Sequence, residues 1–180
     1  LDSIRAAAQV TPVVVQYPVN PVPDFNAFID VLLMKMYKFK GDTGIREELD
    51  IPAEEMERAT ELNRILTEAA AENDEALMEL YFEKGVLTQD ELRSGLKLGL
   101  AKRDLIPVFC ASGKRDIGAK RLMEFIINVA PGPLKAPNFV TVDGREIEPD
   151  SNGPTALFVF KTTVEPHLGE VTYFRVVSGK

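Results

Sequence analysis

The chain has 180 residues, a formal net charge of −7 at neutral pH and an apolar share of 45%. This length is typical of one ordinary domain, or of one domain with part of another, and this apolar share is typical of a globular protein with a core. The negative charge argues against nucleic-acid binding driven by the overall charge, while leaving room for a local basic patch.

Cysteine content and the length of the apolar runs bear on the compartment. The single cysteine, Cys110, cannot form an internal disulfide, which favours a reducing compartment. The longest apolar runs, such as residues 156–160, are far shorter than the roughly 18 residues of a membrane-spanning helix, and no basic-then-apolar leader opens the chain. We therefore expect a soluble cytoplasmic protein with no membrane partner. Because the chain begins on Leu1 and its last predicted strand runs almost to Lys180, we also expect both ends to be cut.

The first fifty residues read as strands. Residues 11–17, TPVVVQY, are a β-branched run bounded by prolines, which predicts a buried strand, and the Pro-rich connection PVNPVPD follows at residues 18–24. Residues 25–39 are largely apolar with partial alternation. We expect a strand or a two-stranded ribbon there, with a turn at residues 41–44.

Three helices are predicted in the next fifty residues. Pro52 suits the first turn of the first helix, because its missing N–H would have no partner there. Residues 73–75 can restart a second helix that stops at Gly85, and TQDE at residues 88–91 is a capping box that opens a third helix ending near Arg103. The first helix carries one apolar stripe, formed by Met56, Ala59, Leu62, Ile65, Leu66, Ala69 and Ala70.

Strand character returns at residues 105–111, followed by an amphipathic helix over residues 118–130. The side chains expected to face inward are Leu122, Met123, Phe125, Ile126 and Val129. APGPLKAP at residues 130–137 is a strong breaker and the best domain boundary. Beyond it the strands ALFVFKTTV and GEVTYFRVV flank the short loop EPHLG. This order predicts an α/β unit followed by an all-β unit.

A possible phosphate loop lies where the strand breaks into Ser-Gly-Lys, within IPVFCASGKRDIGAKRLMEF at residues 106–125. A Walker loop has a glycine five residues before its Gly-Lys pair and Ser or Thr after the lysine, so that backbone N–H groups curl around a phosphate. Val108 and Arg115 occupy those positions here, which excludes a Walker motif.

The same residues follow a strand, and ligands of open α/β sheets lie beyond the carboxyl ends of the strands. Ser112, Gly113 and Lys114 sit there, after Cys110 and Ala111, which are small enough to let a flat ring approach. The N–H of Gly113 can donate to a carbonyl oxygen on a base. The alternative is a plain strand-to-helix turn with a glycine, and the spacing alone does not decide between the two.

The order of a strand, Cys-x-Ser-Gly, Gly118 and a helix ending in APGPLKAP resembles the last part of the GTPase domain of translation elongation factor G. EAAAENDEALMELYFEKGVLTQDEL is similar to the insert subdomain of that factor. TALFVFKTTVEPHLGEVTYFRVVSGK, above all its FRVVSG ending, is similar to the opening strands of its second domain, a β-barrel. The resemblance covers nearly the whole chain in collinear order.

This resemblance implies an α/β fold made of the C-terminal part of a P-loop GTPase domain with a helical insert subdomain, followed by the first strands of an all-β barrel domain. Residues 1–20 would be a late strand region of the GTPase domain, and residues 21–104 the insert subdomain, with a strand ribbon and three helices. Residues 105–133 would be the last strand and helix of the GTPase domain. Residues 134–180 would start the barrel domain.

The resemblance also implies a function, that of a ribosomal translocation factor coupling GTP hydrolysis to movement of transfer RNA and messenger RNA. The full-length parent would bind GTP or GDP with Mg²⁺, and Ser112, Gly113 and Lys114 would be the guanine-contacting loop, where the family usually has Ser-Ala and an apolar residue. The phosphate loop, the switch threonine, the Asp-x-x-Gly-His segment and the Asn-Lys-x-Asp motif would all precede Leu1. We therefore expect no catalytic or metal-binding residue in this chain, no tight nucleotide binding and no hydrolysis by it alone.

Three other features have plain structural explanations. DSNG at residues 150–153 matches Asp-x-x-Gly but lies in a loop after the boundary, which predicts a turn. His167 has no partner histidine or cysteine nearby, which favours a solvated turn residue over a metal ligand. Cys110 ends a buried strand far from that histidine, which favours a small core residue over a nucleophile.

Two surfaces are candidates for partners. Residues 52–84 carry ten acidic side chains against three basic ones, which fits either a solvated helix face or a steering surface for a basic partner. By resemblance that partner is the ribosomal stalk protein. Lys161, Arg175 and Lys180 are either ordinary exposed side chains or, by resemblance, contacts of the second domain with small-subunit ribosomal RNA. Because the first strands of a barrel leave an unpaired edge, we expect residues 138–180 to be partly disordered, to lean on the α/β part, or to pair with another copy.

Other functions stay open beside elongation factor G. One is a ribosome-docking paralogue without GTPase activity, which the Gly113-Lys114 departure favours. Another is a ribosomal-protection or release-factor GTPase of similar build, against which the long acidic insert argues. The third is an unrelated α/β domain, for which the collinear match would be chance.

Overall fold

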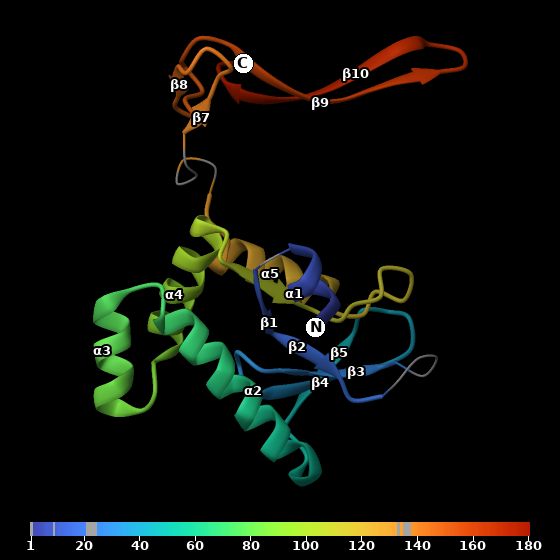
Figure 1. Ribbon diagram of the computed structural model, residues 1–180. Helices are drawn as coiled ribbons and strands as arrows, with labels where there is room; N and C mark the ends of the chain where they lie inside the picture. Colours follow the sequence, from blue (N-terminus) through green and yellow to red (C-terminus); the bar gives the residue numbers. More distant parts are fainter. Residues whose placement is uncertain (1, 9, 21–24, 133, 135–137) are drawn as a thin grey trace. The chain divides into compact units, whose positions relative to one another are not determined.

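The computed structural model describes residues 2–8, 10–20, 25–132, 134 and 138–180 (Figure 1). In these residues the protein has a mixed α/β fold with several sheets and five helices. The chain divides into two compact units, Leu1–Pro131 and Gly132–Lys180.

Both proline-rich segments lie partly outside the described residues. The connection predicted at residues 18–24 lacks residues 21–24, and the breaker predicted at residues 130–137 lacks residues 133 and 135–137. The division between the two units falls inside the second segment. None of the helices in the described ranges combines the length and the apolar character needed to cross a membrane.

A parallel pair of strands, β1 (Thr11–Val14) and β6 (Leu105–Val108), follows the short helix α1 (Asp2–Ala8). The prediction of one strand over residues 11–17 was wrong, because the chain bends at Val15 and continues in a different sheet. The Val15 N–H donates to the Val108 carbonyl (2.9 Å), while the Val15 carbonyl accepts from the Val31 N–H (2.8 Å). One apolar run therefore serves two sheets, and its continuous apolar character hides the bend. The predicted second strand is also shorter, since β6 ends three residues before residue 111.

The second sheet of the first unit is antiparallel, in the order β2-β3-β4-β5 (Figure 1). Its strands are β2 (Gln16–Pro18), β3 (Ala27–Asp30), β4 (Lys35–Phe39) and β5 (Arg46–Leu49). The predicted ribbon is confirmed as β3 paired with β4. The sheet is larger than predicted because β2 and β5 add one strand at each edge, so that one sheet crosses the expected boundary at residue 20.

The three predicted helices are confirmed as α2 (Ala53–Ala71), α3 (Glu75–Lys84) and α4 (Gln89–Lys102). Their ends follow the capping signals in the sequence. The Asp74 side chain accepts from the Leu77 N–H (3.0 Å), which starts α3. Thr88 and Glu91 form the capping box of α4.

The packing of α2 against α4 depends on close approach of the two backbones. A Cβ built on Gly95 of α4 would lie 2.5 Å from the Ala70 carbonyl oxygen of α2. The predicted apolar stripe of α2 is confirmed at Ala59, Leu66, Ala69 and Ala70, which are buried. It is wrong at its edge, because Met56 and Ile65 are 43% and 38% exposed.

Helix α5 (Ala119–Val129) begins after Gly118, whose φ of 80° favours glycine. Phe125 and Val129 are buried as predicted, but Met123 and Ile126 are 62% and 52% exposed. The buried position that the pattern missed is Arg121, at 5% exposure. A pattern of apolar residues predicts a charged residue to face solvent. Arg121 instead faces inward because it pairs with the buried Asp30 carboxylate.

The main core of the first unit lies between the parallel strands, the four-stranded sheet and helices α2, α4 and α5. Its buried apolar members are Val13, Val15, Tyr17, Ile29, Val31, Leu32, Ile51, Ala59, Leu66, Ala69, Ala70, Leu92, Leu96, Leu105, Phe125 and Val129. A second, smaller cluster contains Phe25, Phe28, Tyr37, Phe39 and Ile117. Burial of this apolar surface is the main force that holds the unit together.

The second unit is a set of β-hairpins. A long antiparallel pair joins β9 (Ala156–Glu165) to β10 (Gly169–Ser178), which confirms the predicted hairpin, with a register shift between Tyr173 and Phe174. A short pair joins β7 (Phe139–Val140) to β8 (Glu146–Ile147). The apolar side chains of the long hairpin are largely exposed to solvent.

Candidate functional site

The predicted guanine-contacting loop lies at the carboxyl end of β6. Because β1 runs parallel to β6, the carboxyl ends of both strands meet at the same edge, where ligands of α/β sheets bind. The chain leaves β6 after Val108 and reaches Ser112 through Phe109, Cys110 and Ala111.

Backbone hydrogen bonds close this loop into a tight turn. Ser112 and Ile117 form an isolated antiparallel bridge, with the Ser112 N–H donating to the Ile117 carbonyl (2.9 Å) and the Ile117 N–H to the Ser112 carbonyl (3.0 Å). Gly113 and Lys114 lie at the exposed tip. The Gly113 N–H and the Ser112 hydroxyl make no hydrogen bond with any described residue. Both groups are therefore available to a ligand.

The loop is fastened to the four-stranded sheet on two sides. Ile117 is fully buried in the smaller aromatic cluster. The Arg115 guanidinium donates to the Asp42 carboxylate (2.7 Å) and to the Phe25 carbonyl (2.7 Å). A Cβ built on Gly118 would lie 3.0 Å from the Cys110 carbonyl oxygen, so the end of the loop needs a glycine. Fixed anchors beside a free tip are suited to holding a ligand in one orientation.

Gly113 differs from Gly118, the other glycine of the loop. It lies outside the left-handed region, and a Cβ built on it would meet nothing within 4 Å. The backbone of this turn therefore accommodates the alanine that is usual in the resembling family. The glycine leaves the unliganded tip with more conformational freedom than an alanine would.

A pocket of about 250 Å³ lies directly before the loop. Its walls come from the end of β2, from the residues just before β3 and from the segment after β6. They consist of Pro18, Asn20, Phe25, Phe109, Cys110 and Ala111. The sequence placed Cys110 and Ala111 here, but it missed the other four. The signal that points to them is topological, because β2 continues from β1 and so ends near the same edge as β6.

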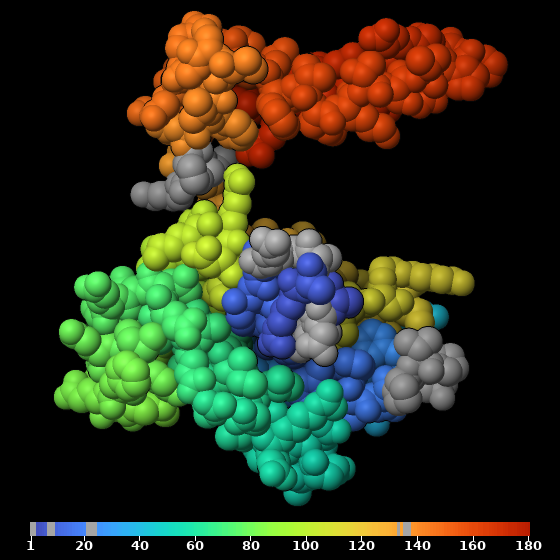
Figure 2. All heavy atoms as spheres, viewed as in Figure 1, coloured from blue at the N-terminus to red at the C-terminus, as the bar shows by residue number. Residues whose placement is uncertain are grey.

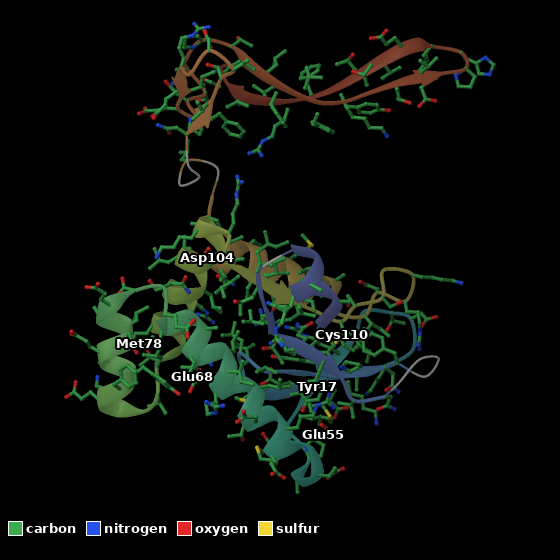
Figure 3. All side chains as sticks on the ribbon, viewed as in Figure 1. Tyr17, Glu55, Glu68, Met78, Asp104 and Cys110 are labelled. Atoms are coloured by element: carbon green, nitrogen blue, oxygen red, sulfur yellow. The ribbon has the colours of Figure 1, made fainter. Side chains whose placement is uncertain are left out.

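Cys110 behaves as a core-facing thiol. Burial, together with the smaller effect of the nearby Asp30 carboxylate, raises the pKa of Cys110 to about 12. The thiol is therefore protonated at neutral pH, which makes it a poor nucleophile. Figure 3 places Cys110 in the first unit, whereas His167 belongs to the second. Among the described residues, no cluster of three or more histidine, cysteine, aspartate or glutamate side chains could hold a metal ion.

The Asp150 segment is a turn, as predicted. The Asp150 carboxylate accepts from the Asn152 N–H (2.9 Å), and the Asp150 carbonyl accepts from the N–H groups of Gly153 and Gly179. These bonds tie the turn to the end of β10.

The acidic residues of α2 and α3 separate into two groups. Four have structural partners within the first unit: Glu55, Glu61, Glu68 and Asp74. Glu55 accepts from the Tyr17 hydroxyl (3.1 Å), and the two lie close together in Figure 3. Hydrogen bonds from Arg64 lower the pKa of Glu61. The other six are exposed and unpaired with described residues, and we call them the open acidic surface: Glu54, Glu57, Glu72, Glu75, Glu79 and Glu83.

The open acidic surface lies on helices that form one continuous part of the first unit, coloured teal to green in Figure 2. Unpaired carboxylates on neighbouring helices repel one another weakly in water and set up a negative potential above the surface. This arrangement fits a basic partner without requiring one.

Two basic side chains of the second unit contact aromatic rings. The Lys161 ammonium lies 5.5 Å from the Tyr173 ring centre, and the Arg175 guanidinium lies 5.6 Å from that of Phe139. Both side chains and Lys180 are exposed. Their charges are therefore accessible to phosphate groups.

No protein-family profile matches the chain. Among solved structures, a crystal structure of a protein from Thermus thermophilus is similar, with a TM-score of 0.71 and 28% sequence identity over 99% of this chain. The match covers 24% of that protein, so the chain spans about a quarter of its length. Both units of this chain thus have counterparts within a longer protein.

Proposed function

We propose that this chain belongs to a translational GTPase of the elongation factor G type, whose full-length form couples GTP hydrolysis to movement of transfer RNA and messenger RNA on the ribosome. The observation that carries the proposal is the Ser112–Ile117 turn at the carboxyl end of β6. It offers an unpaired N–H beside a small pocket, in the collinear context that resembles the factor. The similarity to a four times longer bacterial protein supports a place within a larger chain.

In this proposal Ser112, Gly113 and Lys114 contact the guanine base of GTP or GDP. The Gly113 N–H donates to the guanine carbonyl oxygen, and the pocket before the loop receives the face of the ring. The phosphates, Mg²⁺ and the attacking water are held by residues that precede this chain. Ser112 to Lys114 thus contribute base recognition rather than catalysis.

Nucleotide affinity of the full-length protein tests this role. Because the Gly113 backbone accepts an alanine, Gly113→Ala should make the tip more rigid and tighten binding of fluorescent GDP about 2- to 5-fold. Gly132→Ala is the matched control, since a Cβ there also meets nothing within 4 Å and Gly132 belongs to the second unit. An absence of guanine-nucleotide binding, with adenine nucleotides as comparison, would refute the proposal.

The open acidic surface is proposed to dock the ribosomal stalk protein. Glu54→Lys with Glu57→Lys should weaken stalk binding and flatten its salt dependence, because both side chains are exposed and unpaired. Glu148→Lys with Glu170→Lys, at two exposed positions of the second unit, is the control for the same change in net charge. Unchanged affinity in the double variant would leave the helices with a solvated face only.

A ribosome-docking paralogue without hydrolysis is the second candidate. The exposed Lys114, at a position where the family usually has an apolar residue, favours it. Contact of the second unit with small-subunit ribosomal RNA through Lys161, Arg175 and Lys180 is part of both candidates. Hydrolysis by the full-length protein separates them.

A further inference from the structure

A second pocket in the first unit lies on a different set of residues from the guanine loop tip. It has a volume of about 170 Å³ and lies between the turn that leads into β5 and the start of α5. Since a water molecule occupies about 30 Å³ of liquid, this is room for one small ion with a few waters. Three basic side chains line it, Arg46, Lys120 and Arg121, together with one acidic residue, Asp116.

The guanidinium of Arg46, which lines the pocket, has one buried donor without an acceptor. Nη2 of Arg46 donates to the Glu124 carboxylate (3.2 Å), and the guanidinium lies 4.7 Å from the centre of the Tyr37 ring. Nη1 of Arg46 is buried and has no hydrogen-bond partner. Leaving a charged donor buried and unsatisfied is costly, so such groups are usually paired with an ion or a water.

Arg121 is the second arginine that lines the pocket. It is only 5% exposed, and its Nε donates to the buried Asp30 carboxylate (2.7 Å). Its two Nη atoms have no hydrogen-bond partner among the described residues. Asp30 thus satisfies one of the donors of this guanidinium and leaves the rest of the fork available.

The start of α5 adds further hydrogen-bond donors, which carry partial positive charge. This helix has 11 residues, its N-cap Gly118 has no side chain to cap the first turn, and no acidic residue lies in that turn. The first N–H groups of the helix therefore point outward without a side-chain acceptor, at the positive end of the helix dipole. Helix N-termini combined with arginine forks are the usual binding partners of phosphate-like groups.

We propose that this pocket binds a small tetrahedral oxyanion, either inorganic phosphate or the phosphate of a monoester. Arg46 and Arg121 supply fixed donors, Lys120 supplies a mobile charge at the rim, and the backbone at the start of α5 completes the site. Asp116 lies against Gly44 and opposes the anion at the mouth of the pocket. The proposal does not depend on the guanine-nucleotide function.

Binding of inorganic phosphate to the whole chain, measured by calorimetry at constant ionic strength, tests the site. Arg46→Gln removes the charge beside the pocket and should weaken binding about 10-fold or more. Lys120→Gln, at an exposed position, should weaken it a few-fold. Lys38→Gln, exposed on β4 and away from the pocket, is the matched control and should leave the affinity unchanged.

Asp116→Asn should change the affinity for phosphate in the opposite direction. Asp116 has a φ of 50°, which asparagine also tolerates, so the turn should keep its shape. Removing the carboxylate should tighten phosphate binding, and this variant keeps the test valid if Arg46→Gln fails to fold. The backbone amides of residues 119–121 should show the largest nitrogen and proton chemical-shift changes on titration.

A parallel titration with methyl phosphate distinguishes the two sources of the anion. Equal binding of both ligands would identify a monoester site, and binding of inorganic phosphate alone would identify a site for the free ion. Absence of saturable binding of either would overturn the proposal. It would also be overturned if the Lys120→Gln and Asp116→Asn variants bound phosphate with the same affinity as the unaltered chain.

Discussion

Both units of this chain contain apolar runs, but the first unit buries them and the second leaves them exposed to solvent. All apolar side chains that are buried in the described residues lie between Val13 and Val129, in the first unit. In the second unit, the run Leu157, Phe158, Val159 and Phe160 is 51% to 60% exposed. Apolar content alone therefore does not make a core. The first unit closes one by covering its strands with helices and a second sheet, whereas the hairpin of the second unit has no such cover among the described residues.

The continuous apolar run in β9 is itself informative. Strands with one wet face alternate apolar and polar residues, whereas strands covered on both faces are apolar throughout. β9 has the second pattern in a hairpin whose side chains are exposed on both faces. Further protein surface over this hairpin is what the proposed barrel domain would supply.

The largest effect is expected for a pair of phenylalanine truncations, one in each unit. Phe28 is fully buried, so Phe28→Ala should lower the free energy of unfolding by about 4 kcal/mol. Phe160 is 60% exposed, so Phe160→Ala should change it by less than about 0.5 kcal/mol. Urea unfolding followed by circular dichroism measures both, and a cost of similar size at Phe160 would show that the hairpin is covered.

The buried ion pair of the first unit gives the next largest effect. Asp30→Ala leaves the Arg121 charge buried without its carboxylate and should cost about 3 kcal/mol. Lys35→Ala is the matched control, because the Lys35–Asp50 pair is exposed and its loss should leave stability nearly unchanged. Thermal unfolding of both variants decides whether the pair stabilises the unit.

Disturbing the close packing of α2 against α4 should cause a smaller loss of stability. Gly95→Ala forces a methyl group against the Ala70 carbonyl and should destabilise the first unit by about 1–3 kcal/mol. Gly132→Ala, with open space around it, should not. A neutral result at Gly95 would mean that α2 and α4 can separate at little cost.

Hydrogen exchange compares the units without any mutation. Amides of β1 and β6 should exchange only on global opening, because these strands lie in the main core. Amides of β9 and β10 should exchange faster, since few buried side chains hold the hairpin. Full protection of the hairpin in a monomer would contradict the contrast, and protection that rises with protein concentration would indicate pairing between copies.

Local signals in the sequence predicted the helices well. Pro52, Asp74 and the Thr88–Glu91 box act within a few residues and mark the starts of the three helices, and Gly85 marks the end of the second. The sequence predicted packing between distant residues less well. The bend at Val15 depends on hydrogen bonds to residues 16 and 93 positions away, and nothing in the run TPVVVQY encodes them.

The candidate site shows the same limit. The Ser112–Lys114 tip follows from the order of strand, turn and helix, but Pro18, Asn20 and Phe25 join the pocket only through the sheet topology. Arg121 was missed because its inward position depends on a partner 91 residues away. Residues whose roles depend on distant partners are therefore the ones that pattern reasoning overlooks.

Hydrolysis of GTP by the full-length protein, with and without ribosomes, tests the proposed function most directly. The proposal predicts slow turnover by the protein alone and strong stimulation by ribosomes, with Gly113 and Lys114 as a working variant of the guanine loop. Ribosome binding without any turnover would contradict it and would identify a docking protein in which these 180 residues supply surface rather than base recognition.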